Sequence, residues 1–218
     1  LYRLVQTLAN QGMLAFDPER QSYSMGIRLV RLAHSAWRYS SLAPVARPYI
    51  EALSAKVGEA VHLAQFDNGH VLFVDKCKAT DNFETLAQAG KIAPGYCTGV
   101  GKAILAFLPE VKQNRALDQQ SYTAHTPFTL TDRAALVAEL TKIKSTGVAY
   151  DREEHEQGII SIACPILTGQ GRVVGAVSIA SSTNRYTIDD LEKQRPNLLK
   201  SANLIGSEAE LWQVPTWS

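Results

Sequence analysis

The chain has 218 residues, 45% of them hydrophobic and 20% charged, with a formal net charge of +1. This composition is typical of a globular protein with one substantial core, and no apolar run approaches the roughly 20 residues that a membrane span requires. No secretory signal pattern opens the chain, and Cys77, Cys97 and Cys164 are scattered without CxxC spacing, which indicates reduced thiols in a cytoplasmic protein.

Positive charge is concentrated near the N-terminus. Residues 1–48 contain six arginines against Asp17 and Glu19, a net charge of +4, so the rest of the chain carries −3. A basic arm on a mildly acidic body indicates a segment that faces a polyanion. The first ten residues have the pattern of the middle of a helix, so we expect the sequence to begin inside a longer domain.

The arm is predicted to contain a helix and a hairpin. Leu4, Val5 and Leu8 repeat at helical spacing, and Gly12 suits the left-handed position after a helix end. The opposite face carries side-chain types that contact phosphates and base edges, namely Tyr2, Arg3, Gln6, Thr7 and Asn10. Two short extended runs follow around the turn at 17–20. This is the second half of a winged helix-turn-helix, although these residues suit any helix–hairpin pair equally well.

The body is predicted to mix helices with antiparallel strand pairs. A helix at 27–39 has an apolar stripe of Ile27, Val30, Ala33 and Trp37, and further helices are expected at 44–57, 99–108, 132–146 and from Thr187 onward, with a kink or restart at Pro196. Thr98 is the expected N-cap of the helix at 99–108, and Thr131 is the expected N-cap of the helix at 132–146. Strands are expected at 61–66, 70–77, 83–89, 148–151, 159–166 and 172–180, with a loop at 90–98. The fold class is therefore α+β.

The glycine-rich stretch GVGKA at 99–103 is compatible with two structures. It is not a phosphate-binding P-loop, because position 96 is Tyr and position 103 is Ala where that motif has Gly and Ser or Thr. Gly99 and Gly101 leave the first N–H groups of a helix uncovered, which makes a small anion site. Close packing of this helix on the sheet explains the glycines equally well.

The acidic cluster at 151–156 contains Asp151, Glu153, Glu154, His155 and Glu156. A zinc site would need several converging His or Cys residues, and no HxxxH or CxxC partner is present, so we predict neither a metal nor another cofactor. Nothing in the sequence brings a cysteine to a histidine as a nucleophile pair. A solvated turn accounts for the three glutamates. Asp151 differs, since the alternation of residues 148–151 directs it at a face of the sheet.

Several stretches, in order and spacing, resemble the IclR family of bacterial transcriptional regulators: YRLVQTLANQGML, YSMGIRLVRLA, GVGKAILAFLP, TLTDRAAL, GVAYDREEHEQGIISIACPI and GAVSIASS. The resemblance implies part of a winged helix-turn-helix at 1–26, a linker helix at 27–41, and a GAF-like effector-binding domain with a mainly antiparallel sheet at 42–213. It implies a homo-dimer or tetramer on duplex DNA, and a chain that begins inside the recognition helix. Tyr2, Arg3 and Gln6 would enter the major groove, and Arg20 on the wing would meet phosphate.

The resemblance also implies a pocket for a small metabolite, often a carboxylate. Its anionic end should meet the N-terminus of the helix at Gly99 and Val100, with Asp151, Ser161 and Ser178 as polar walls and Ala93 on one side. Ala180 departs from relatives that have serine there, which favours a larger or more apolar ligand. An ionised Asp151 would repel a carboxylate, so we expect Asp151 to accept a hydrogen bond from the ligand or to be protonated. The glutamates that follow it are predicted to be turn residues.

We therefore predict a regulator, not an enzyme, in which the effector closes loops around its pocket and changes DNA affinity by population shift. The alternative is a GAF-like sensor or a thiol-dependent enzyme that uses Cys77, Cys97 or Cys164. A pure dimerisation module would have no pocket at all. In a dimer, Ile27, Val30 and Trp37 are expected on the buried seam.

Overall fold

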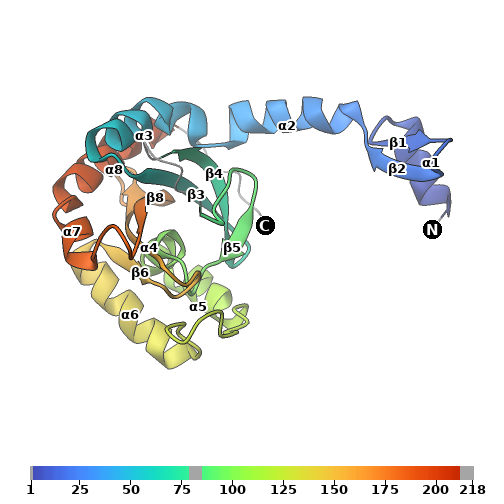
Figure 1. Ribbon diagram of the computed structural model, residues 1–218. Helices are drawn as coiled ribbons and strands as arrows, with labels where there is room; N and C mark the ends of the chain where they lie inside the picture. The colour runs from blue at the N-terminus through green and yellow to red at the C-terminus, as the bar shows by residue number, and fades with distance from the viewer. Residues whose placement is uncertain (1, 79–84, 212–218) are drawn as a thin grey trace.

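The structure is a computed structural model that describes residues 2–78 and 85–211, and it has two parts joined by a helical rod (Figure 1). The N-terminal part contains α1 (Tyr2–Asn10), β1 (Leu14–Asp17) and β2 (Ser22–Met25), and α2 (Ile27–Ser40) extends from it toward the body. Within the described ranges, none of the helices combines the length and the apolar character that a membrane crossing demands.

The N-terminal part has the predicted helix and hairpin. Gly12 has φ 69°, its N–H donates to Ala9 (2.9 Å), and the Met13 N–H donates to Leu8 (2.9 Å), which together form a Schellman motif. The Asp17 carboxylate accepts hydrogen bonds from two N–H groups in the turn between β1 and β2, as expected for aspartate before a turn.

The body is built on one curled sheet of six antiparallel strands, in the order β5-β4-β3-β8-β7-β6. Its strands are β3 (Ala60–Asp67), β4 (His70–Cys77), β5 (Ile92–Pro94), β6 (Ala149–Arg152), β7 (Ile159–Leu167) and β8 (Val173–Ser182). The hairpin of β3 and β4 turns at Asn68 and Gly69, which both have positive φ, as the Asn-Gly pair predicts.

Helices cover both faces of this sheet (Figure 1). On one face lie α3 (Ala43–Val57), α7 (Ile188–Glu192) and α8 (Arg195–Glu208), followed by the short 3-10 helix η1 (Ala209–Leu211); on the other lie α4 (Gly99–Phe107), α5 (Glu110–Asp118) and α6 (Arg133–Thr146). Alternation along the strands supplies two cores: Leu63 and Ile162 pack under α3 and α8, while Ala64 and Ala163 pack under α4. The α+β prediction is confirmed.

The structure differs from the local predictions in three regions of the chain. The strand expected at 83–89 is absent over residues 85–89, and residues 83–84 lie outside the described ranges; β5 instead occupies the predicted loop. Gly90 has φ 86° and its N–H donates to Phe73, so the chain turns there and pairs with β4 only afterwards. The helix α5 was not predicted, because only Ala116 and Leu117 of it are buried and no apolar stripe marks it. The N-cap of α6 is Asp132, which accepts from the Ala135 N–H, rather than Thr131.

The other predicted helix boundaries hold. Thr98 caps α4 through the Gly101 N–H, and Gly147 ends α6 with φ 75°. Thr187 and Asp190 form a reciprocal capping box at the start of α7. A new helix, α8, begins at the predicted restart, and Pro196 lies in its first turn, where the missing N–H is not needed.

Candidate functional site

The first turn of α4 presents two hydrogen-bond donors that no described residue satisfies. The Thr98 hydroxyl accepts from the Gly101 N–H (3.2 Å), and the Thr98 carbonyl accepts from the Lys102 N–H (3.0 Å). The N–H groups of Gly99 and Val100 have no hydrogen-bond partner among the residues that the structure describes. Because they point out of the positive end of a helix, they form a site suited to an anionic oxygen.

Close packing also requires these glycines. A Cβ atom at Gly99 would lie 2.7 Å from the Ser161 Oγ, and one at Gly101 would lie 2.4 Å from the Gly95 carbonyl oxygen. The Gly95 backbone cannot move away as a flexible side chain could. Both alternatives left open by the sequence therefore hold together: the glycines let α4 approach the sheet, and this approach aims its N–H groups at the strands.

A small cavity of about 40 Å³ lies in front of this helix end. It brings together six of the predicted effector-site residues: Gly99, Val100, Asp151, Ser161, Ser178 and Ala180. Sheet register explains the grouping, since Asp151 pairs with Ser161, Ser161 with Ala180, and Ser178 with His62 across neighbouring strands. Ala93 is not among the lining residues. It lies on β5 opposite Val71 and packs in the core under α4.

Several cavity residues were not predicted from the sequence as effector contacts: His62, Phe73 and Thr85 were not singled out, and His155 was considered only as a metal ligand. His62 is buried, and burial lowers its pKa to about 3, so its ring is neutral. Its Nε2 lies 3.1 Å from the Thr85 hydroxyl. Alternation along β3 could have predicted the position of His62, because it places His62 on the same face of the sheet as Ala64, under α4.

Asp151 is buried at the end of β6 with 7% of its surface exposed. Burial, and next the nearby charge of Glu154, raise the pKa of its carboxyl to about 7. One of its oxygens accepts a hydrogen bond from the Glu154 N–H (2.8 Å). Asp151 can therefore carry a proton at neutral pH, which allows it to donate as well as accept at the cavity wall.

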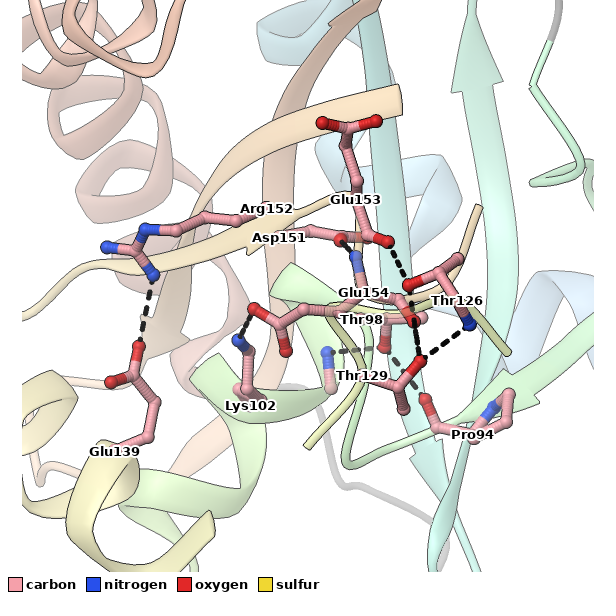
Figure 2. Close-up of polar contacts among 11 residues, drawn as sticks. Pro94, Thr98, Lys102, Thr126, Thr129, Glu139, Asp151, Arg152, Glu153 and Glu154 are labelled. Atoms are coloured by element: carbon pink, nitrogen blue, oxygen red, sulfur yellow. Dashed lines mark hydrogen bonds and ion pairs between the residues drawn. The ribbon is translucent and has the colours of Figure 1, made fainter. Parts of the chain in front are cut away.

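Glu154 is the main correction to the sequence interpretation. It is not an exposed turn residue: Figure 2 shows its side chain directed at Lys102 of α4, where the two groups form an ion pair of 2.5 Å with 5% and 1% of their side chains exposed. Burial raises the pKa of the Glu154 carboxyl, and the Lys102 ammonium opposes that shift. The pair ties the turn after β6 to α4.

The other two glutamates do occupy the turn. Glu153 has φ 61° and its carboxylate accepts from the Gly158 N–H (2.8 Å), which closes the turn. Glu156 accepts from the Leu86 N–H (3.1 Å) and borders the cavity. The Thr126 hydroxyl donates to the Glu153 carbonyl (2.6 Å) and steadies the same segment from the loop before α6 (Figure 2).

The arrangement offers little to metal or thiol chemistry. Within residues 2–78 and 85–211, no three His, Cys, Asp or Glu side chains converge as metal ligands. Cys77, Cys97 and Cys164 are buried and free, and burial raises the pKa of each thiol, that of Cys77 to about 11. Protonated, enclosed thiols are weak nucleophiles, so the geometry does not favour a thiol-dependent enzyme.

The residues predicted to contact DNA lie on the exterior of the N-terminal part. Tyr2, Arg3 and Gln6 lie on α1, which has no buried residue, and the Gln6 amide is 3.4 Å from the Tyr2 hydroxyl. Arg20 is exposed in the turn between β1 and β2 and lies 3.9 Å from Asp17.

Comparison with known proteins assigns the chain. The family described as "Bacterial transcriptional regulator IclR C-terminal" matches residues 34–207. The chain belongs to the IclR family. It is 31% identical over 192 residues to the HTH-type transcriptional regulator XynR of Escherichia coli, a match that covers 88% of this chain and 75% of that protein. As an IclR-family member it is a transcriptional regulator, and its relatives are regulators rather than enzymes.

Solved structures share the fold. The IclR protein of Thermotoga maritima superposes with a TM-score of 0.80 at 27% identity, covering 96% of this chain and 84% of that one. A double mutant of the PobR inducer-binding domain from Acinetobacter, in complex with 3-hydroxybenzoic acid, superposes with a TM-score of 0.71 at 26% identity and covers 77% of this chain and 99% of that one. Both confirm the fold predicted from the sequence.

Proposed function

We propose that this IclR-family regulator acts in the cytoplasm, binds duplex DNA through residues 1–26, and is controlled by a small organic acid bound within residues 42–213, with residues 27–41 as the linker. The N–H groups of Gly99 and Val100, two residues that line the cavity at the start of α4, are unpaired among the described residues and carry the proposal. A carboxylate placed there would meet two backbone donors and the positive end of α4. These backbone groups would be its main source of positive potential, because none of the described residues in the cavity wall is a lysine or arginine.

The remaining walls favour a ligand with a hydroxyl or amide group away from its carboxylate. Asp151 exchanges a proton near neutral pH and can pair with such a group, while Ser161 and Ser178 add neutral hydrogen bonds. Ala180 leaves the neighbouring wall apolar. The 3-hydroxybenzoic acid bound by the PobR domain belongs to the same chemical class, which supports this proposal.

Ligand entry requires the cavity to expand. Its volume of about 40 Å³ suffices for a few water molecules and is smaller than an aromatic acid. In place of the loop closure expected from the sequence, we expect the effector to bind a more open conformation and to shift the population toward it. We expect the turn after β6 and the start of α4 to move together, because the buried ion pair of Lys102 and Glu154 joins them.

DNA binding is assigned to Tyr2, Arg3 and Gln6 of α1, in the major groove, and to Arg20 on phosphate. The linker supports a homo-dimer or tetramer, since Ile27, Val30 and Trp37 of α2 are 80%, 49% and 41% exposed in the single chain. A helix that leaves such a stripe in water is expected to bury it against a second copy.

Calorimetric titration tests the effector site. Small hydroxy acids, including 3-hydroxybenzoate, are first screened for a rise in melting temperature, and the strongest is titrated into the wild type and variants. Asp151→Ala should weaken binding by about 1–3 kcal/mol, and Ser161→Ala and Ser178→Ala by less, because neutral hydrogen bonds are weaker. Asp151→Asn should retain a ligand that donates to the amide oxygen. Unchanged affinity in Asp151→Ala would place the ligand elsewhere.

A mobility-shift experiment with the intact protein and its own upstream DNA tests the other half of the proposal. Binding should weaken steeply with salt, and Arg3→Gln should weaken it more than Lys144→Gln on α6, which removes the same charge far from α1. Absent or salt-insensitive binding, with and without acids, would contradict DNA recognition by this segment. Sedimentation showing a monomer at micromolar concentration would contradict the α2 seam.

A further inference from the structure

A second, larger cavity lies at the opposite end of α4 from the effector site. This groove has a volume of about 420 Å³, within the range of sites for small organic ligands. It is bordered by the last turn of α4, one face of α5, the end of β3 and the start of β8, and Figure 1 shows α4 and α5 next to each other in this region.

One face of α5 supplies the positive charge of the groove. Lys112, Arg115, Ala116 and Gln119 line it at the i, i+3, i+4, i+7 spacing of a single helix face. Neither Lys112 nor Arg115 has an ion pair or hydrogen bond with any residue in the described part of the chain. Arg172, just before β8, adds a third cation to the wall.

The groove is lined by positive but not by negative side chains, as far as the described residues go. None of the described residues that line the groove is acidic. The acids of α5, Glu110 and Asp118, are not lining residues, and Asp118 pairs with Arg133 instead (3.3 Å). The end of α4 is also capped, because the Gln113 side chain donates to the Leu105 carbonyl (2.7 Å). An anion in the groove would therefore meet two cations that are unpaired among the described residues, and little repulsion.

The floor of the groove is apolar. Ile104, Leu108, Ala116 and Val174 line it and are themselves buried, while Phe107 is half-buried at its edge. Such a floor favours a ligand with a hydrophobic body, and the volume accommodates one without the expansion that the cavity of about 40 Å³ at the start of α4 requires. We propose that this groove is a second binding site, which takes an organic anion with an aromatic or aliphatic body larger than the effector.

The probe for this site is 8-anilino-1-naphthalenesulfonate, an aromatic anion whose fluorescence rises in apolar surroundings. We expect saturable binding of one molecule per chain in the groove, and a dissociation constant about tenfold higher in K112Q/R115Q, because two partly screened charge contacts are lost. The neutral analogue N-phenyl-1-naphthylamine should bind the wild type more weakly than the anion, and K112Q/R115Q should not change its affinity.

Two matched variants identify the surface that binds. K142Q/K144Q removes two exposed charges from α6, and R31Q/R38Q removes two from α2, which also has an exposed apolar stripe. Both should bind the sulfonate as the wild type does. Equal weakening in either control, or unchanged binding in K112Q/R115Q, would overturn the proposal. The site does not depend on the proposed effector, so a saturating hydroxy acid should not displace the probe, and competitive displacement would also overturn it.

Discussion

Replacing Asp151 by asparagine should change how the stability of the protein depends on pH. The pKa of Asp151 rises from its ordinary value of 3.8 to about 7 in the folded protein, mainly because the carboxyl is buried. A folded state that holds a proton more tightly than the unfolded chain is stabilised at low pH. This contribution is complete below pH 3.8, and it is lost as pH rises from 3.8 to about 7.

The size of the effect follows from the two pKa values. The interval between 3.8 and about 7 corresponds to a loss on the order of 4 kcal/mol of folding free energy across that pH window. The substituted asparagine side chain has the shape of the protonated acid, and its oxygen can still accept from the Glu154 N–H. Asp151→Asn should therefore match the wild type near pH 4 and exceed its stability by a few kcal/mol at pH 7.5.

Urea unfolding at several pH values between 4 and 8 measures this difference. Titrating groups that do not interact with Asp151 act on both proteins alike, so the informative quantity is the free-energy gap between the wild type and Asp151→Asn at each pH, to which the neighbouring Glu154 also contributes. Asp189→Asn on α7, which replaces an exposed aspartate in the same domain, should show no such widening. A gap that stays constant from pH 4 to pH 7.5 would refute the buried, proton-holding Asp151.

Three further changes test the packing around α4. Lys102→Met should lower the free energy of unfolding by about 3–5 kcal/mol, since it leaves the Glu154 charge buried without a partner. In denaturant titrations, the double variant Lys102→Met with Glu154→Leu should recover most of this loss, and no recovery would mean that the two residues are not coupled. Gly99→Ala should lower the melting temperature because its Cβ clashes with Ser161, and adding Ser161→Ala should restore part of the loss. An unchanged melting temperature in Gly99→Ala would contradict the close approach of α4 to β7. Thr98→Ala should cost about 0.5–2 kcal/mol in urea unfolding, and a loss of zero would show that its cap is dispensable.

The sequence predicted local structure best where one residue type determines the conformation. Asn68-Gly69, Gly147 and the Thr187 capping box each satisfy a backbone requirement within a few residues, so their elements were found. The α5 helix was missed because its exposed surface carries no periodic signal. Glu154 was misread for a related reason: a glutamate between charged neighbours looks solvated, and only the tertiary approach of α4 brings Lys102 to it.

The cavity proposed to bind the effector was predictable in part. Asp151 on β6 was expected from alternation, Ser161, Ser178 and Ala180 were expected only from the family resemblance, and the helix start was expected from its glycines. His62 and Thr85 belong to segments that the fold brings in from far along the chain, and Ala93 was assigned to the wall although β5 holds it against Val71. Such placements depend on the order of strands in the sheet, which no local pattern specifies.

The two outermost strands of the six-stranded sheet are also its shortest: β5 has three residues and β6 has four. Pro94 in β5 has no N–H to offer, and Arg152 in β6 exposes a charge beside the rim. Unpaired strand edges are where sheets of different molecules join and aggregate, and brief, proline-bearing or charged borders discourage such joining. Copies of this protein are therefore expected to associate through side chains on helices, and to remain resistant to fibril-like stacking even at high concentration.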